Sequence, residues 1–343
     1  MFYDVNGNSL NNGYSVAGAQ LTVGYDVNGN RIEATPDEPE APYSIDNVVS
    51  YYQQPTLAMA SEINALPNNV VSFVILTDTH GSSNKQHSQN IASYLVRNTK
   101  ADKLIHLGDV SSNLWSENEY RTYFSPLITD ALKHMYFACG NHEWFNNNWS
   151  GLEVIYNDIL STKQNIVGYP AHFYYYFDDT AKKVRYMVIN TSDGAANAVT
   201  NAQISWITTN VSNLPSDWRL IVFGHYDIMP NDPITNQWNS SSETKFTNAI
   251  SAASCPIVGY FCGHEHHDRL VKVNNKFMQV TMLNDSFSRD TSFAEIVNPT
   301  RTAGTVSEQA ASVVCVNLTT GAVEVKRIGA KNPDISMSYN FLT

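Results

Sequence analysis

The stretch that decides the fold is VSFVILTDTH, from Val71 to His80. Its first six residues are apolar except Ser72, and a continuous apolar run of this length is typical of a buried strand in an α/β sheet. Asp78 and His80 follow directly, where the strand ends. Because the carboxyl ends of the strands form the ligand crevice of such a sheet, this arrangement predicts a functional site at that edge.

Four more strand-like runs end in the same way. Each is followed by a glycine and then by side chains of types that commonly bind metals. The runs are Leu104 to Leu107, Met135 to Cys139, Leu220 to Phe223 and Ile257 to Cys262, and the polar residues after them are Asp109, Asn141, His142, Glu143, His225, His264 and His266. Strand ends that are far apart in the sequence meet in space in α/β folds, so we expect these side chains to converge.

The residue types fit a site for divalent cations. Carboxylates, imidazoles and an amide oxygen are ligands that Mn²⁺, Fe²⁺ and Zn²⁺ accept, and the glycines let the backbone turn tightly beside them. No cysteine lies among these residues, which argues against a structural zinc site. Any one of them alone would be better explained as a turn aspartate or a core histidine, but the ordered set indicates a metal centre.

Taken in order, the five clusters resemble the signature of the calcineurin-like metallophosphoesterase superfamily. Its blocks read D-x-H, G-D, G-N-H-[DE], G-H and G-H-x-H, and the resemblance spans roughly residues 70 to 283. It implies a four-layer αββα sandwich, two mixed sheets flanked by helices, and a two-metal phosphoesterase. It also implies a cage of seven ligands, in which Asp78, His80 and His266 hold one metal, Asn141, His225 and His264 hold the other, and Asp109 bridges both.

The expected reaction is hydrolysis of a phosphomonoester or a phosphodiester. Two metals about 3.5 to 4 Å apart would clamp the phosphate, and a bridging water of lowered pKa would attack phosphorus in line. His142 is not a ligand in the family pattern, so its imidazole is the expected catalytic group that protonates the leaving oxygen. Two divalent ions, Mn, Fe or Zn, are the expected cofactors.

Two subgroups of the superfamily are disfavoured. The protein serine/threonine phosphatases carry an aspartate where this chain has Ser112, and that aspartate would have oriented His142; Asn113 is a candidate substitute. The purple acid phosphatases place a metal-binding tyrosine at that position and lack the histidine of the first block. We therefore favour a small diester or nucleotide-like substrate.

The rest of the chain alternates strands and helices. Helical patterns cover 58–66, 91–96, 117–132 and 202–211, and in the last of these the apolar residues share one face. Residues 173–177 and 184–189 have hairpin spacing, and 271–280 and 313–325 indicate further strands that turn at Asn274-Asn275 and Thr320-Gly321. These strands exceed the need of one doubly wound sheet, so a two-sheet sandwich flanked by helices is predicted.

The first 45 residues differ from the rest. The sequence YDVNGN at Tyr3 to Asn8 recurs at Tyr25 to Asn30, and an acidic, proline-bearing stretch follows. Asn-Gly favours hairpin turns, so each copy could form a small hairpin, but two copies bury too little to be a stable domain alone, and a flexible leader is the favoured interpretation. We expect an N-terminal extension and linker at 1–45 and a phosphoesterase domain at 46–343. A second hypothesis is a non-catalytic component of a larger assembly, such as a phage particle, attached to its partner through residues 1–45.

Composition limits the classes of partner and the cellular location that we expect. The formal charge of -11 comes with no basic run, which disfavours extended nucleic acid and an anionic membrane as partners. Two bound cations would still attract a small phosphate ester. The four cysteines show no CxxC spacing and are predicted to be buried thiols. No signal peptide or membrane-spanning run is visible, so a cytoplasmic location is the expectation by default.

Several neighbouring residues are further candidates. Glu143 could accept hydrogen bonds behind the cage or cap the loop after it. His267 and Asp268 are expected at the surface, with contact behind the cage as the alternative. The loop Trp144 to Trp149 and the segment Met229 to Trp238 follow the third and fourth blocks and could shape substrate access. The histidines without ligand spacing, expected to be structural or exposed, are His87, His106, His134 and His172.

Overall fold

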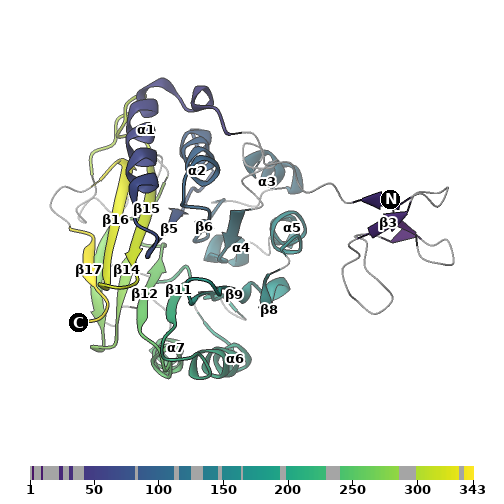
Figure 1. Ribbon diagram of the computed structural model, residues 1–343, viewed down its shortest axis with the longest axis vertical. Helices are drawn as coiled ribbons and strands as arrows, with labels where there is room; N and C mark the ends of the chain where they lie inside the picture. Colours follow the sequence, from purple (N-terminus) through teal and green to yellow (C-terminus); the bar gives the residue numbers. More distant parts are fainter. Residues whose placement is uncertain are drawn as a thin grey trace. The chain divides into compact units, whose positions relative to one another are not determined.

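The computed structural model divides into two compact units, residues 1–41 and 42–343. In the second unit it describes all residues except 82–83, 112–115, 125–133, 146–148, 164, 194–197, 229–239, 286–298 and 332–335, and in the first unit it describes four short strands. Two sheets and the helices on their outer faces make up the second unit (Figure 1).

One sheet has six strands in the order β17-β16-β15-β5-β6-β7. Its parallel strands are β5 (Val70–Leu76), β6 (Leu104–His106) and β7 (Met135–Phe137). Its antiparallel strands are β15 (Ala310–Asn317), β16 (Ala322–Gly329) and β17 (Ser338–Asn340). All of β5 after its first residue is buried, as the apolar sequence of this strand predicts.

The second sheet has seven strands in the order β13-β14-β12-β11-β10-β9-β8. Four run parallel, namely β10 (Val184–Val188), β11 (Arg219–Phe223), β12 (Ile257–Cys262) and β14 (Phe277–Thr281), whereas β8 (Val167–Tyr169), β9 (Tyr174–Asp179) and β13 (Arg269–Val273) pair antiparallel. The predicted hairpin β9–β10 is confirmed, with Asp179 opposite Val184. In the predicted turn between β13 and β14, Asn274 and Asn275 have the left-handed φ values of 47° and 56° that a tight hairpin turn requires.

Aromatic rings fill the space between the sheets. Phe73 of β5 contacts Tyr186, Phe223 and Phe261 of the other sheet edge to face, with ring centroids 6.2, 5.4 and 5.6 Å apart. All four side chains are fully buried. Edge-to-face contact is a favoured geometry for aromatic pairs, and these rings form part of the core that joins the two sheets.

Helices cover the outer face of each sheet. α1 (Ser50–Ala65) and α2 (Gln86–Asn98) pack on the six-stranded sheet, and α6 (Asn201–Ser212) and α7 (Ser240–Ser251) pack on the seven-stranded one (Figure 1). The predicted apolar face of α6 is confirmed, because Ile207, Val211 and Leu214 are buried against β10, β11 and β12. The order of layers is therefore the predicted helix, sheet, sheet, helix.

Several helices differ from the sequence-based prediction, which did not include α4 (Asn141–Phe145) and α5 (Trp149–Ile155). α1 begins at Ser50 and not near residue 58, because the helix continues through Pro55, a residue that normally interrupts one. α7 was not predicted, because its sequence SSSETKFTNAIS offers only three apolar residues for burial, Phe246, Ala249 and Ile250. The helix predicted at 117–132 forms as α3 (Glu117–Phe124), and its second half lies outside the described residues.

The N-terminal unit contains two antiparallel strand pairs. β1 (Phe2–Tyr3) pairs with β2 (Ser9–Leu10), and β3 (Val23–Tyr25) pairs with β4 (Arg31–Glu33). Each pair flanks one copy of the repeat, so the strands of both predicted hairpins are confirmed; the turn residues 4–8 and 26–30 lie outside the described part. In the second unit, the backbone N–H of Tyr43 donates to Asn98 Oδ1 at 3.1 Å, which ties residues before 46 to α2.

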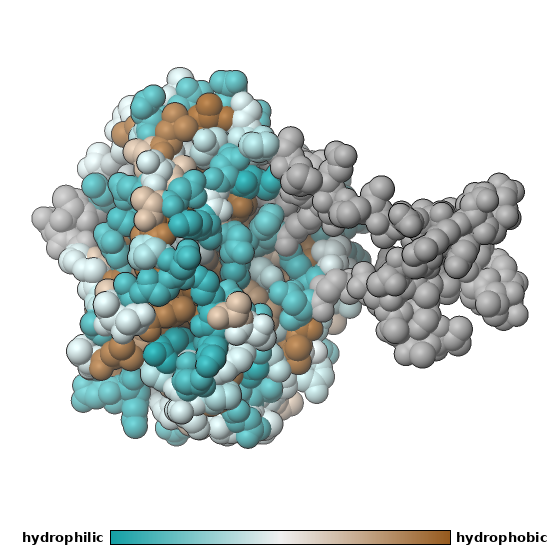
Figure 2. Space-filling model, in the orientation of Figure 1, coloured by the Kyte–Doolittle hydropathy of each residue, from teal (hydrophilic) through white to brown (hydrophobic). Residues whose placement is uncertain are grey.

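On the face shown in Figure 2, hydrophilic residues predominate and hydrophobic ones form small patches between them. No helix among the described residues has the length and apolar character needed to cross a membrane. All four cysteines are buried and free, as predicted.

Candidate metal centre

The five predicted blocks lie at the carboxyl ends of β5, β6, β7, β11 and β12. The first two are held in register by the backbone, because parallel pairing continues past the strands: Asp78 N–H donates to Gly108 O at 3.0 Å, and His80 N–H donates to Asp109 O at 3.1 Å. The fourth and fifth blocks are joined in the same way by Gly263 N–H and His225 O at 3.0 Å. Sheet geometry therefore brings the blocks together, as predicted from the strand ends.

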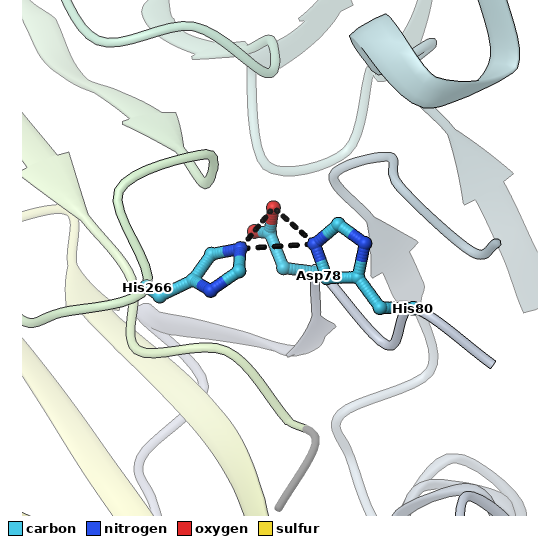
Figure 3. Close-up of side chains that lie close together, drawn as sticks. All are labelled: Asp78, His80 and His266. Atoms are coloured by element: carbon cyan, nitrogen blue, oxygen red, sulfur yellow. Dashed lines mark hydrogen bonds and ion pairs between the residues drawn. The ribbon is translucent and has the colours of Figure 1, made fainter. Parts of the chain in front are cut away.

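The first group of ligands consists of Asp78, His80 and His266 (Figure 3). His266 Nε2 lies 2.9 Å from His80 Nε2 and 3.4 Å from Asp78 Oδ1, and His80 Nε2 lies 3.8 Å from that oxygen. The figure shows both rings and the carboxylate pointing toward one another, Asp78 and His80 from the loop after β5 and His266 from the loop after β12. These three donor atoms surround one point, as the ligands of a single cation do.

The second group consists of Asp109, His225 and His264, with Asn141 beside them. His225 Nε2 lies 3.1 Å from Asp109 Oδ2, 3.0 Å from Asn141 Oδ1 and 3.3 Å from His264 Nδ1. Asp109 Oδ2 is also 3.9 Å from His80 Nε2 of the first group. All seven residues predicted from the sequence are thus in one place, and Asp109 lies between the two groups.

Five of the seven cage residues have an unusual backbone conformation. Asp78, His80, Asp109, His264 and His266 have φ between 49° and 70°, in the left-handed region that residues with a Cβ rarely adopt. Such a conformation costs about 1 to 3 kcal/mol per residue and persists only where the surroundings enforce it. The concentration of strain at these positions indicates a preorganised functional site.

The glycines of the blocks allow close approach of the backbone to the ligand carboxylates. A Cβ on Gly140 would lie 2.1 Å from Asp109 Oδ1, and one on Gly263 would lie 2.3 Å from Asp78 Oδ2. A Cβ on Gly108 would meet the backbone of Gly140 at 2.6 Å. The glycines in these blocks are therefore required by packing against the carboxylates and against one another.

Glu143 anchors two of the loops. Its fully buried carboxylate accepts the backbone N–H groups of Asp109 at 2.8 Å, Val110 at 2.8 Å and Gly140 at 2.9 Å. Of the two interpretations of Glu143, acceptor behind the cage or cap of the following loop, the structure favours the first. Burial, reinforced by the negative charge of Asp109, raises the pKa of Glu143 to about 7.

Hydrogen bonds orient the two ligand carboxylates. Asp78 Oδ2 accepts from Thr77 Oγ1 at 2.6 Å and from His264 N–H at 2.9 Å, and Asp109 Oδ1 accepts from His142 N–H at 2.9 Å. Asp78 Oδ1 is buried and accepts no hydrogen bond in the described part of the chain. A buried carboxylate oxygen without a donor is costly. A cation shared with His80 and His266 would satisfy it, so the residues present fit a metal.

The charges of the cage suit cation binding. Burial would raise the pKa of Asp109 and Asp78, but the neighbouring histidines lower both well below the ordinary range, so the carboxylates stay ionised. Burial lowers the pKa of His80 and of His264 to about 3, which keeps these imidazoles neutral. His225 differs: burial opposes its protonation, yet Asp109 and Asp78 raise its pKa to about 10. Cations bound here would displace that proton.

His142 is partly exposed, as is His264, whereas the other six cage residues are buried. The His142 side chain is 27% exposed, and its Nε2 lies 3.9 Å from Asp109 Oδ2. Its ring lies edge to face with that of His80, with centroids 4.8 Å apart. A third group, His80, Asp109 and His142, also has ligand atoms within 4.8 Å of one another, so the distances alone allow His142 either role. Ser112 and Asn113, considered above as its partner, lie outside the described residues.

Some residues near the cage differ from expectation. His267 and Asp268 were predicted at the surface and are buried: His267 Nδ1 lies 2.8 Å from Glu265 O, and Asp268 accepts Leu283 N–H at 3.0 Å and pairs with Arg327 at 2.5 Å. The prediction was wrong because Asp268 is held by Leu283 and by Arg327 of β16, and His267 lies against the Glu265 carbonyl. Residues 146–148 of the loop 144–149 and all of 229–238 lie outside the described residues.

A buried polar network behind the first block was missed. Asp285 Oδ2 accepts hydrogen bonds from Thr79 Oγ1 at 3.0 Å and Ser88 Oγ at 3.1 Å, and Thr79 Oγ1 lies 2.8 Å from Tyr123 OH and 3.3 Å from His106 Nε2. Burial raises the pKa of Asp285 to about 7 against the opposing effect of these hydrogen bonds. The rule that polar residues at strand ends mark a site, applied to β14 and β10, would have found Asn284-Asp285 and Asn190 to Asp193.

Comparisons with known proteins agree with this geometry. A model of the calcineurin-like phosphoesterase family matches residues 71–268, more than half of the chain. A search of curated protein sequences finds no match. Among solved structures, a dimetal phosphatase from Danio rerio has 11% identity and a TM-score of 0.54, over 79% of this chain and 98% of that chain; at this identity the similarity is one of fold.

Two 5′-nucleotidases are more distant. The one from Candida albicans has 18% identity and a TM-score of 0.37, over 62% of this chain and 45% of that chain. The one from Thermus thermophilus has 11% identity and a TM-score of 0.40, over 76% of this chain and 54% of that chain. The family model and the five blocks lead to one conclusion: the chain belongs to the calcineurin-like phosphoesterase family.

Proposed function

We propose that this protein hydrolyses a phosphomonoester or a small phosphodiester, with two divalent cations in the cage and His142 as the proton donor. The observation that supports it most is the position of Asp109. Its Oδ2 atom is 3.1 Å from a histidine nitrogen of one ligand group and 3.9 Å from a histidine nitrogen of the other. A carboxylate at that point can serve two neighbouring cations.

The roles of the cage follow from its two groups. Asp78, His80 and His266 would hold one cation, and Asn141, His225 and His264 the other. When bound, the cations would polarise the phosphoryl oxygens and supply a water of lowered pKa as the nucleophile. Nitrogen and oxygen donors of this mixture are compatible with Mn²⁺, Fe²⁺ or Zn²⁺.

His142 is the group best placed to meet the substrate. His80, His225 and His266 are buried, whereas His142 and His264 are partly exposed, and of these two His264 would bind a cation. The hydrogen bond from the backbone N–H of His142 to Asp109 Oδ1 fixes its position. A proton given to the leaving oxygen makes departure of a poor leaving group easier, and a positioned acid contributes about 10² to 10⁴ in rate.

The test combines metal analysis with hydrolysis. The protein reconstituted with Mn²⁺ should cleave p-nitrophenyl phosphate or its bis ester, and Asp109→Asn should lose bound metal and activity together. Asp46→Asn, at an exposed position distant in sequence from every block, is the matched control. If the wild type cleaves neither ester and Asp109→Asn binds metal as the wild type does, the proposal is wrong.

The role of His142 has a test of its own. His142→Ala should keep its metal content but lose rate, and the loss should be larger for an alkyl phosphate than for p-nitrophenyl phosphate, because nitrophenolate leaves without a proton. Equal losses on both esters would contradict the role of proton donor. Loss of metal from the variant would instead assign His142 to the ligands.

A further inference from the structure

We propose that a cavity of about 490 Å³ beside the third and fourth blocks receives the alcohol part of the phosphate ester, and that it accepts an uncharged or cationic ring and disfavours a further anionic group. The inference rests on the proposed function and deepens it. Neither the cavity nor its lining residues belong to the cage.

The cavity borders the third block. Cys139 lines it and directly precedes Gly140, whose backbone packs on the Asp109 carboxylate. The cavity therefore begins one residue before the third block.

The cavity also borders the fourth block. Asn190, Ser192 and Asp193 line it and follow β10, the strand next to β11, which leads to His225. Between them, Thr191 Oγ1 accepts the backbone N–H of Tyr226 at 3.3 Å, and the Tyr226 ring lies 4.1 Å from that of His264. A substrate whose phosphate is held in the cage can therefore extend its alcohol part along the end of β10.

The apolar and aromatic walls of the cavity suit a ring of the substrate. Phe173 and Leu152 are buried with part of their surface on the cavity, and Tyr156, of the helical turn η3 (Tyr156–Leu160), is half-buried beside them. Asn190 is fixed by hydrogen bonds: its Nδ2 donates to His172 O at 3.0 Å and its Oδ1 accepts Ser192 N–H at 2.8 Å. A volume of about 490 Å³ falls in the range of small-molecule pockets, roughly 300 to 1,000 Å³, and far exceeds the need of a phosphate group alone.

The charges of the lining decide which groups fit. Glu153 and Asp193 contribute two carboxylates, and no lysine or arginine is among the described lining residues. Asp193 is held in place, because its Oδ2 accepts Gln203 Nε2 at 3.0 Å and also the Thr200 hydroxyl. An anionic group in the cavity would meet these two like charges, with no lysine or arginine among the described lining residues beside it, whereas a neutral or positively charged group would meet no like charge from them.

Three variants test the inference in the full-length, metal-loaded protein. Ala171→Trp, on the turn η4 (Pro170–His172), fills the cavity from a position outside the blocks. Glu153→Lys reverses a charge at an exposed lining residue. Asn157→Lys is the control, because it adds a positive charge to an exposed residue four positions further along, outside the lining residues.

The substrates are ethyl phosphate, benzyl phosphate, 4-carboxybenzyl phosphate and 4-(aminomethyl)benzyl phosphate, each also as its methyl diester, and the measurement is kcat/KM. Ala171→Trp should lower kcat/KM for the benzyl esters on the order of tenfold or more and leave that for the ethyl ester within about twofold. Glu153→Lys should shift the preference between the carboxylated and aminated esters by roughly threefold or more toward the carboxylated one, and Asn157→Lys should not.

The outcomes separate this inference from the proposed function. If the wild type cleaves no ester, the proposed function fails. If it cleaves all esters but neither Ala171→Trp nor Glu153→Lys changes the preference among them, the cavity inference is overturned and the hydrolase remains. Should Ala171→Trp not fold, as judged by thermal unfolding, the charge reversal at Glu153 decides alone.

Discussion

A methyl group at Gly263 should disable the cage without replacing any ligand. A Cβ built there lies 2.1 Å from Thr77 Oγ1 and 2.3 Å from Asp78 Oδ2. Carbon contacts are optimal near about 3.5 Å, so in Gly263→Ala the Asp78 carboxylate, or the loop that carries Gly263, must move by about 1 Å. The same oxygen accepts the backbone N–H of His264 at 2.9 Å, and the movement therefore reaches a second ligand.

The magnitude follows from this displacement. A misplacement of about 1 Å can lower the rate about 100-fold, which corresponds to about 2.7 kcal/mol of transition-state stabilisation. Overpacking also lowers the free energy of unfolding by about 1 to 3 kcal/mol. We expect Gly263→Ala to lose kcat/KM on that scale and to bind metal more weakly than the wild type.

The assay compares kcat/KM, metal content and thermal unfolding with those of Gly304→Ala. Gly304 has a φ of 73°, and no atom of the described residues lies within 4 Å of the point where its Cβ would be, so alanine there introduces backbone strain, about 1 to 2 kcal/mol, and no collision. Gly304→Ala should lose stability and keep its activity. Full metal content and a kcat/KM within twofold of the wild type in Gly263→Ala would refute the reasoning.

Three further outcomes are expected. Burial raises the folded-state pKa of Asp285 from 3.8 to about 7, so the folded protein favours the protonated carboxyl. The contribution of this proton to the free energy of unfolding is on the order of 4 kcal/mol. It is complete below the unfolded pKa and is lost as the pH rises through 7. Asp285→Asn should remove this pH dependence, measured by denaturant unfolding of the metal-free protein from pH 4 to pH 8; an unchanged slope would contradict it. In Glu143→Gln an amide NH₂ replaces an oxygen that accepts a buried N–H, such as that of Val110. This variant should lower the free energy of unfolding by about 1 to 3 kcal/mol and weaken metal binding. Metal affinity equal to that of the wild type would contradict the role of Glu143 in holding the two loops. Phe73→Ala should lose about 3 to 5 kcal/mol in denaturant unfolding, whereas Leu57→Ala, at an exposed position, should lose little; equal losses would contradict the assigned core.

The cage was predictable because its geometry follows from strand order. Each ligand comes within a few residues of a buried apolar strand, and parallel strands present their carboxyl ends at one edge. Asp78 and His266 are 188 positions apart in the sequence, yet the rule needs only that their strands end on the same side. The backbone strain at the same residues was not predictable, because the sequence does not distinguish an aspartate or histidine with a left-handed backbone from one with an ordinary backbone.

The cavity and some helices could not be predicted for a different reason. The lining of the cavity comes from four segments of ordinary composition, and only packing shows that Leu152 and Asn190 face the same space. α7 has few apolar residues because one side of it alone is covered. α1 contains Pro55 in its second turn, and the burial of Tyr52 and Thr56 on either side holds the helix together where local propensity would end it.

The left-handed backbone of the cage residues serves catalysis and lowers the stability of the fold. Glycine would adopt the conformations of Asp78, His80, Asp109, His264 and His266 with far less strain, but glycine offers no donor atom. At each of these positions, a sequence selected for thermal stability alone would carry glycine in place of the ligand. In directed evolution toward a hardier protein, these five positions are where gains in melting temperature should appear together with loss of the reaction.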